Sequence, residues 1–207
     1  MEFITDPSLI EERSMAIIAP HIAALGLTPA AAKIYSRIIH AAGDVDYANH
    51  IRIHPLAAEA AGRALKSGCD IFCDVEMVRT GINRRRLGEL GGSAHCLIAD
   101  PAIAAAAKSA GTTRAMAAMR AFGPRLHGAV VAIGNAPTAL FELLKIIAET
   151  DIRPAAIIGV PVGFVGAAES KELLAATAPV PYITVAGTKG GSPIAAAAVN
   201  AILYLQG

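Results

Sequence analysis

The chain has 207 residues, and its 18 Lys and Arg nearly balance its 17 Asp and Glu, which leaves a formal net charge of +1. This balance gives no overall attraction to nucleic acid, and 4 % aromatic residues without Trp offer few platforms for base stacking. Hydrophobic residues reach 54 %, yet Gly, Pro and Asn interrupt the longest apolar stretches before the ~20 residues of a membrane-spanning helix. The N-terminus has acids where a signal peptide has a basic start. We therefore expect a cytoplasmic protein, one domain over residues 1–207, with no nucleic-acid or membrane partner.

Two helices are predicted at the N-terminus. Asp6-Pro7 is a typical helix start, and the apolar residues that follow fit a helix of about four turns. A Gly-Leu-Thr-Pro break then makes Thr28 the expected N-cap of a second helix. We expect these helices, within residues 7–42, to pack on the core of the same domain.

The middle of the chain contains short elements of both kinds. The predicted elements are, in order, a strand over Tyr47–Ile53, a helix over Pro55–Lys66, strands over Asp70–Cys73 and Ala94–Ile98, and helices over Ala102–Ala110 and Thr113–Phe122. The three cysteines, Cys69, Cys73 and Cys96, lie in or beside the apolar strands. We interpret them as small buried hydrophobic residues.

The second half of the chain repeats one pattern three times: an apolar strand, a turn of small residues and a helix. The copies begin at Ala129, Ala155 and Tyr182. Strands that follow one another through helices run parallel, so the pattern predicts a three-layer α/β fold, a parallel β-sheet with helices on both faces. Open sheets of this kind bind ligands beyond the carboxyl ends of their strands, and we expect the functional site there.

Small residues at these strand ends suit close contact between backbone and ligand. They are Gly134, Asn135, Pro137, Gly163, Gly166, Gly187, Gly190 and Gly191. The second turn lacks the GxGxxG spacing of dinucleotide-binding folds, and the third lacks the GxxxxGK[ST] order of a phosphate loop. Neither nucleotide motif is therefore predicted.

Three histidines are candidates for a metal ligand or an acid: His40, His50 and His54. His50 and His54 are four residues apart, but Pro55 argues against a helix and no third ligand is evident, so no metal site is predicted. His40 ends a predicted helix, where the imidazolium is favoured, and Asp44 and Asp46 follow it and are expected to orient or charge it. Histidine titrates near pH ~6.5, which suits a proton donor. A helix-capping role and a catalytic role fit the sequence of His40 equally well.

Two basic residues are placed to bind carboxylates. Arg114 follows two threonines at a helix start, and Lys189 lies in a strand-end turn. The sequence thus predicts a site for a large anionic ligand. This site has several basic groups, many backbone N–H donors and one acid, His40.

Several segments in combination resemble the precorrin-8X methylmutases of corrin biosynthesis. The matching segments are IEERS (Ile10–Ser14), RIIHAAGDVDYA (Arg37–Ala48), MVRTGIN (Met77–Asn83), GTTRA (Gly111–Ala115), AIGNAPTALF (Ala132–Phe141), IGVPVGFVGAAESKELL (Ile158–Leu174) and KGGSPIAAAAVNA (Lys189–Ala201). They keep their order and cover nearly the whole chain.

The resemblance implies an isomerase of cobalamin biosynthesis that moves a methyl group from C-11 to C-12 of a tetrapyrrole, precorrin-8 or its cobalt form. It also implies a flavodoxin-like sheet, a homodimer and no protein-bound cofactor. It assigns proton donation to His40. The substrate-binding residues that it implies are Arg13, Ser14, Thr80, Gly81, Thr113, Arg114, Asn135, Gly163, Phe164, Lys189 and Gly190.

The last turn departs from the family pattern RGRKGGS. Ala186 and Thr188 stand where the family commonly has arginines, which leaves Lys189 as the only cation of this loop. The segments GINRR, LGG, GTTRA and PVPYI resemble more closely the branch of the family that acts on cobalt-containing substrate.

Two rival functions use the same predicted pocket. A non-catalytic tetrapyrrole carrier would need no acid at its centre, and His40 therefore favours the enzyme. A flavin-binding flavodoxin-like domain is disfavoured because so few aromatic side chains are available to stack on the ring.

Overall fold

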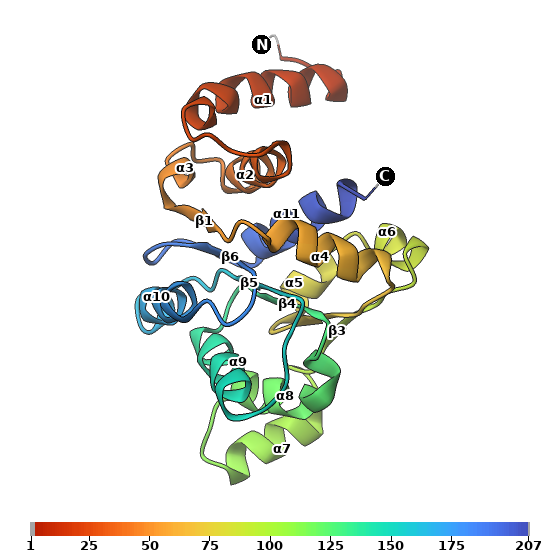
Figure 1. The fold of residues 1–207 in the computed structure, drawn as a ribbon, viewed down its shortest axis with the longest axis vertical. Coiled ribbons are helices and arrows are strands. Elements are labelled where there is room, and N and C mark those ends of the chain that lie inside the picture. The colour runs from red at the N-terminus through yellow and green to blue at the C-terminus, as the bar shows by residue number, and fades with distance from the viewer. Residues whose placement is uncertain (1–2, 207) are drawn as a thin grey trace.

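The computed structural model describes residues 3–206 and is built on a six-stranded sheet (Figure 1). The strands are β1 (Ile51–Ile53), β2 (Ile71–Cys73), β3 (Ala94–Cys96), β4 (Val130–Ile133), β5 (Ala156–Gly159) and β6 (Tyr182–Val185), in the order β1-β6-β5-β4-β2-β3. All neighbours pair in parallel except β1, which lies antiparallel to β6 at one edge. The predicted α/β fold is confirmed, with this one antiparallel strand added.

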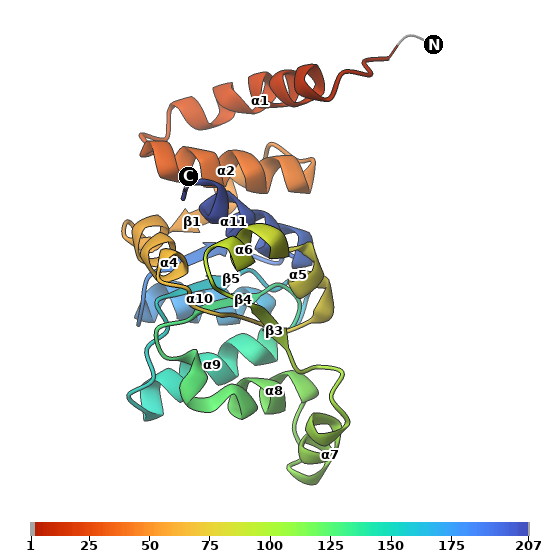
Figure 2. The ribbon, with the colours of Figure 1, turned by 90° about the vertical axis from the view of Figure 1, so that its right-hand side faces the viewer.

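Helices cover both faces of the sheet (Figure 2). One face is covered by α4 (Ala57–Lys66), α5 (Glu76–Gly81) and α11 (Ser192–Tyr204), and the other by α8 (Arg114–Phe122), α9 (Pro137–Glu149) and α10 (Ala167–Thr177). Outside these layers, α1 (Pro7–Ala23) and α2 (Pro29–Ala42) stack beyond α11, and α7 (Pro101–Ser109) lies beyond α8. Short connecting helices are α3 (Tyr47–His50), α6 (Arg84–Glu89) and the 3-10 turn Gly123–Leu126.

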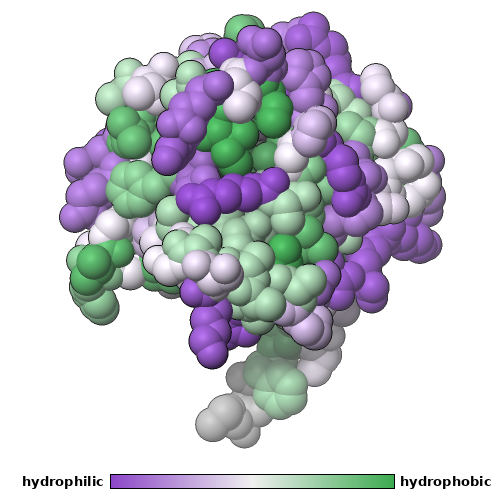
Figure 3. All heavy atoms as spheres, turned by 90° about the horizontal axis from the view of Figure 1, so that it is seen from below, coloured by the Kyte–Doolittle hydropathy of each residue, from purple (hydrophilic) through white to green (hydrophobic). Residues whose placement is uncertain are grey.

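The two N-terminal helices begin where their caps predict. The Asp6 carboxylate accepts hydrogen bonds from the first backbone amides of α1, and the Thr28 hydroxyl accepts one from the third residue of α2. Helix α1 is the outermost element in Figure 2, and Ile18 is its only buried residue. Ile17 on the same helix is 64 % exposed. At the opposite end of the molecule, beyond α7, hydrophilic and hydrophobic side chains are interspersed (Figure 3).

The segment after α2 differs from its prediction as a strand. The Asp44 carboxylate accepts the Asp46 backbone N–H, and this local bond starts a helical turn over Tyr47–His50, so only Ile51–Ile53 is extended. The helices α5 and α6 were not predicted either, because six residues are too few to show a helical period.

Helix α11 is the most deeply embedded helix of the upper layers in Figure 1. Nine of its 13 residues are buried, and most of those are alanine, valine or isoleucine. At Gly81, an added Cβ would come within 2.8 Å of the Ala196 Cβ, so α5 and α11 are in close backbone contact. Small residues on both helices make this approach possible.

Asp74 fixes the turn that follows β4. Its carboxylate is fully buried and accepts backbone hydrogen bonds from Gly134, Asn135 and Ala136 at 3.0, 2.9 and 2.7 Å. Burial raises the pKa of Asp74, and the three amide donors act in the opposite direction. The side chain at the end of β2 therefore sets the backbone at the end of its neighbour β4.

We expect Asp74→Ala to lower the free energy of unfolding by roughly 3 kcal/mol, because three amides in this turn lose a charged acceptor. The measurement is urea denaturation followed by circular dichroism. Asp100→Ala is the control, since Asp100 caps α7 at an exposed site with one amide, a contact worth about 1 kcal/mol. Equal losses in the two variants would contradict the role given to Asp74.

Candidate active site

The carboxyl ends of β4, β5 and β6 lie at one edge of the sheet, and the turns after them meet there. The Gly163 N–H donates to the Thr188 carbonyl at 3.2 Å, and the Gly191 N–H donates to the Val160 carbonyl at 2.9 Å. The structure thus places several predicted site residues along this edge. They are Asn135, Gly163, Phe164, Lys189 and Gly190.

Glycine is required where the last of these turns packs on its neighbour. Gly190 has φ +155°, and a Cβ at this position would collide with the carbonyl oxygens of Val160 and Pro161. Phe164, in the turn after β5, is by contrast not packed: the residue is 95 % exposed. The edge therefore combines a tightly packed turn with a projecting aromatic side chain.

Lys189 is the centre of an ion-pair cluster. Its Nζ lies 2.8 Å from carboxylate oxygens of both Asp44 and Asp46, and 5.3 Å above the centre of the Tyr47 ring. These contacts raise the pKa of Lys189 and lower the pKa values of both aspartates, chiefly through the hydrogen bonds between the ammonium and the carboxylates. The positive charge of Lys189 is thus compensated within the protein.

The two aspartates do not serve His40 as the sequence suggested. Asp44 and Asp46 both bind Lys189, and Asp46 also accepts hydrogen bonds from Asn49 and His50. The expectation that they orient His40 is therefore wrong. A cation from a turn more than 140 residues away competes for them, and no local pattern reveals that contact.

His40 lies in the last turn of α2 beside a cavity. The cavity has a volume of about 310 Å³ and is lined by Arg37, His40 and Ala41 of α2 and by Ala197, Asn200 and Tyr204 of α11. Gly43, with φ +62°, ends the helix three residues later. Within residues 3–206, the His40 imidazole makes no hydrogen bond or ion pair. Both of its ring nitrogens are therefore available to a ligand.

Asn200 brings a second sequence motif to this cavity. Its side chain accepts the Asn83 backbone N–H at 2.8 Å and donates to the Gly81 carbonyl at 2.9 Å. The Asn83 side chain in turn donates to the Tyr204 hydroxyl at 2.9 Å. The segment of the predicted site residue Gly81 is thus held beside the His40 cavity, whereas the Thr80 hydroxyl is turned back onto its own helix.

Arg37, Asn200 and Tyr204 are cavity residues that the sequence did not single out for the site. Asn200 carried a usable signal, because it is the one polar side chain between Pro193 and Leu203 of an apolar helix. Arg37 gave none, since an arginine on an exposed helix face is common, and here it also pairs with Glu11 at 3.1 Å.

A second cavity, of about 520 Å³, adjoins the first. It lies between α1, α2 and the end of α11, and it shares Arg37 and Tyr204 with the His40 cavity. The predicted residues Arg13 and Ser14 belong to α1 beside it but do not line it, and the Ser14 hydroxyl donates to the Ile10 carbonyl.

Thr113 and Arg114 lie on the other face of the sheet from His40. The Thr113 hydroxyl lies 3.1 Å from that of Thr138, which joins the starts of α8 and α9. Arg114 is exposed and makes no ion pair or hydrogen bond with the described part of the chain, residues 3–206. Its guanidinium is available for an anion, but within one chain it does not share a cavity with His40.

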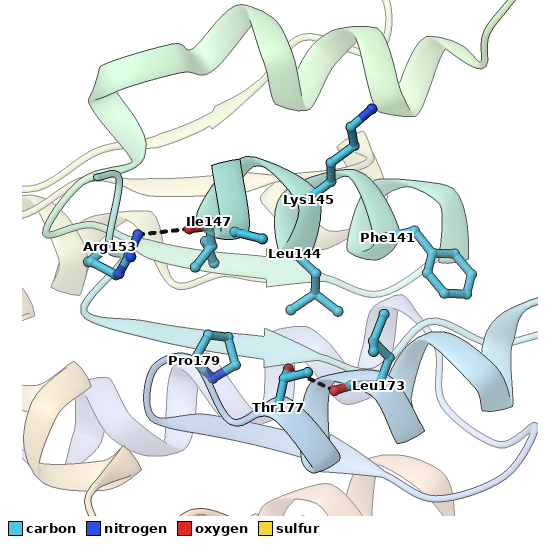
Figure 4. A pocket seen from close by; sticks show the side chains of 9 residues that line it. Phe141, Leu144, Lys145, Ile147, Arg153, Leu173, Thr177 and Pro179 are labelled. Carbon is cyan, nitrogen blue, oxygen red and sulfur yellow. Dashed lines mark hydrogen bonds between the residues drawn. The ribbon is translucent and has the colours of Figure 1, made fainter. Parts of the chain in front are cut away.

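A separate apolar groove of about 450 Å³ lies between α9 and α10 (Figure 4). Two of its polar side chains are bound to backbone: Arg153 donates to three carbonyls, including that of Ile147, and the Thr177 hydroxyl donates to the Leu173 carbonyl. A third, Lys145, pairs with Glu149. The groove contains none of the predicted site residues.

Metal ligation and thiol chemistry find little support in the side chains. His50 binds Asp46, and no group of three or more His, Cys, Asp or Glu within residues 3–206 is arranged to hold a metal ion. Burial raises the pKa values of Cys69 and Cys96 to about 11, so these thiols stay protonated near neutral pH. Within the same residues, no helix is both long and apolar enough to cross a membrane.

The fold and the His40 cavity define an α/β protein with an imidazole, unpartnered among residues 3–206, beside a cavity between α2 and α11. Comparison with known proteins identifies the family. A family model described as precorrin-8X methylmutase matches residues 9–205. The chain belongs to the precorrin-8X methylmutase family, and it is an isomerase of cobalamin biosynthesis.

Relatives and solved structures agree with this assignment. The chain is 44 % identical to a precorrin-8X methylmutase of Sinorhizobium sp, covering 97 % of this chain and 96 % of that protein. It is 41 % identical to a cobalt-precorrin-8 methylmutase of Leptospira interrogans, covering 95 % and 93 %. Its fold matches the crystal structure of a precorrin-8X methylmutase from Thermus thermophilus with a TM-score of 0.86 and 36 % identity, over 95 % of this chain and 96 % of that one.

Proposed function

We propose that this enzyme moves a methyl group from C-11 to C-12 of precorrin-8, assisted by a proton from His40. The observation that carries the proposal is the imidazole of His40, which has no partner among residues 3–206 and lies beside a cavity built from two family motifs. A side chain already committed to a structural contact would be a poor proton donor, and His40 has none among residues 3–206.

The methyl shift requires little more from the protein than a proton donor. One carbon–carbon bond breaks at C-11 and one forms at C-12, so substrate and product are isomers. Protonation of the conjugated macrocycle lets positive charge develop at the migration origin and lowers the barrier. The proton is returned when the product forms, and the atoms balance without an oxidant or a nucleophile.

The acetate and propionate arms of the substrate are anionic partners for exposed basic side chains such as Arg114. We retain the binding residues implied by the family motifs, led by Arg114 and Gly163, and add Arg37 and Asn200 because they line the His40 cavity. Relatives of both names match at 41–44 % identity, so assays should include both metal-free and cobalt-containing substrate.

A tetrapyrrole carrier is the second candidate, since it would use the same cavity. The two differ in what they do to the ligand: a carrier returns precorrin unchanged, whereas the methylmutase alters its conjugation. A visible spectrum of the protein with added precorrin separates them, because a spectrum that shifts on binding but never converts indicates a carrier.

We expect His40→Asn to lower kcat at least about a hundredfold while product affinity stays within about threefold, because a general acid contributes to the transition state more than to binding. Turnover is followed by the visible spectrum and affinity by product titration. His21→Asn is the matched control, since His21 also lies in the last turn of an N-terminal helix. Near-normal turnover by His40→Asn would show that His40 is not the proton donor.

We expect Arg114→Ala to weaken product binding about tenfold to a hundredfold, the loss of one charge-assisted hydrogen bond. The measurement is product titration at low and high salt. Arg63→Ala serves as the control, because Arg63 is an exposed helix arginine paired with Glu59 on the opposite face of the sheet. Unchanged product affinity at low salt would show that Arg114 does not bind a carboxylate of the ligand.

We further propose that the enzyme is a cytoplasmic homodimer. The high apolar fraction and the exposed apolar side chains of α1, among them Leu9, Ile10 and Ile17, support a covering second copy. His40 and Arg114 lie on opposite faces of one chain. A ligand that touches both must therefore wrap around the carboxyl edge or be shared by two copies.

Light scattering should give twice the chain mass of 21.2 kDa, and Ile17→Glu should shift the protein towards monomer by placing a charge in the apolar surface of α1. Leu56→Glu is the control, because Leu56 is similarly exposed, at 54 %, but lies at the start of α4. A monomeric mass for the unmodified protein would contradict the dimer.

A further inference from the structure

Lys171 is a buried cation that the proposed chemistry does not use. The residue is 1 % exposed, and its Nζ donates to the Lys189 carbonyl oxygen at 2.6 Å. Among residues 3–206 this is its only hydrogen bond, and no carboxylate pairs with it. Burial lowers the pKa of Lys171 to about 8. Burying an ammonium group without a counter-ion costs stability, so its presence in α10 needs a reason.

The reason lies in the peptide unit that Lys171 contacts. The carbonyl of Lys189 and the N–H of Gly190 belong to the same peptide plane. Burial raises the pKa of Tyr47, and the neighbouring backbone of Gly190 acts in the opposite direction, which places the phenol beside the N–H end of this peptide. Lys171 therefore holds the carbonyl end of this peptide, and the Tyr47 side chain, which also lies under the Lys189 ammonium, is at its N–H end.

The backbone of this turn does not choose the orientation by itself. Gly190 and Gly191 have φ values of +155° and +124°, in a region where glycine moves freely between alternatives. A rotation of the Lys189–Gly190 peptide would exchange its carbonyl and N–H. An external contact must select one orientation, and the Lys171 ammonium, which is a donor, can bind only the carbonyl.

The selected orientation matters to the segment that follows His40. The backbone of Lys189 is fixed by Lys171, and its side chain reaches Asp44 and Asp46 at 2.8 Å. Those aspartates connect α2, which carries His40, to the turn that carries Tyr47. The Asp44–Tyr47 segment thus contacts the turn of Lys189 in two ways, through its aspartates and through the Tyr47 ring.

We propose that Lys171 is a positioning residue of the methylmutase site: it fixes the Lys189–Gly190 peptide and thereby holds the Asp44–Tyr47 segment at the end of the helix that carries His40. The proposal rests on the role proposed above for His40. Lys171 touches no reacting atom; it acts through the turn.

The test replaces Lys171 with methionine, a side chain of similar length without a donor. We expect kcat to fall about tenfold to a hundredfold with a smaller change in KM, because a small displacement of a catalytic group affects the transition state most. We expect the melting temperature to stay level or rise, because the substitution removes a buried charge. A residue with a purely structural role would show the opposite, a lower melting temperature.

The Gly190 amide reports the peptide orientation directly. Its resonance in ¹⁵N–¹H spectra should move in Lys171→Met and stay in place in Lys145→Met, the same substitution at an exposed position of α9. Tyr47→Phe removes the contact at the other end of the peptide. The double variant Lys171→Met with Tyr47→Phe should lose no more activity than Lys171→Met alone, since both changes release one peptide.

An unchanged kcat in Lys171→Met, an unmoved Gly190 amide, or additive losses in the double variant would each overturn the proposal. If Lys171→Met does not fold, Lys171→Gln is judged by the same criteria. The amide spectrum needs no substrate, so failure of the His40 assignment is recognised separately, by normal turnover in His40→Asn.

Discussion

The thickness of α11 sets the distance between the sheet and the helix that carries His40. One side of α11 packs on the strands and the other on α2, and nine of its 13 residues are buried. Alanines allow this, as at Ala196, where α5 approaches so closely that Gly81 has no room for a Cβ. Alanines provide no polar side-chain groups. Asn200 therefore has two roles: it lines the His40 cavity, and it binds the backbone of Gly81 and Asn83. The wall that α11 gives to the cavity therefore combines the small Ala197 with two polar side chains, Asn200 and Tyr204.

Most hydrogen-bond donors at the carboxyl edge are satisfied by the protein itself. The amides after β4 bind Asp74, and the Lys189 ammonium binds Asp44 and Asp46. A glycine-rich turn in an open parallel sheet usually suggests a phosphate or carboxylate site, because its amides point outwards. Here internal carboxylates occupy that position in two places. The anion-binding capacity left to the described residues thus lies in side chains such as Arg114 more than in the glycine turns.

The fold was largely accessible from the sequence, and the contacts of the site were accessible only in part. The three strand–turn–helix copies predicted β4 to β6 and their parallel arrangement, because period and turn chemistry are local properties. The start of α2 followed from Thr28, and His40, which was expected to end this helix, lies in its last turn. The aspartates after it were assigned wrongly, because their partner Lys189 is more than 140 residues away. Tyr47–His50 was assigned to a strand for a different, local reason: the Asp44 side chain bonds to backbone two residues on, which overrides the extended propensity of its neighbours.

The buried charges of this protein are concentrated where they control backbone geometry. Asp74 and Lys171 are almost completely buried without an ion-pair partner, and each contacts backbone in a turn after a strand, one after β4 and the other after β6. Glu142 is different, since it is buried but satisfied by two hydrogen bonds from Arg120 that join α8 to α9. Stability alone would favour an apolar residue in place of Lys171, which has no counter-ion. A charge of fixed sign does what an apolar side chain does not: it distinguishes a carbonyl from an N–H. Turns rich in glycine have the freedom to present either group, and these two side chains remove that freedom at the edge where the ligand is expected.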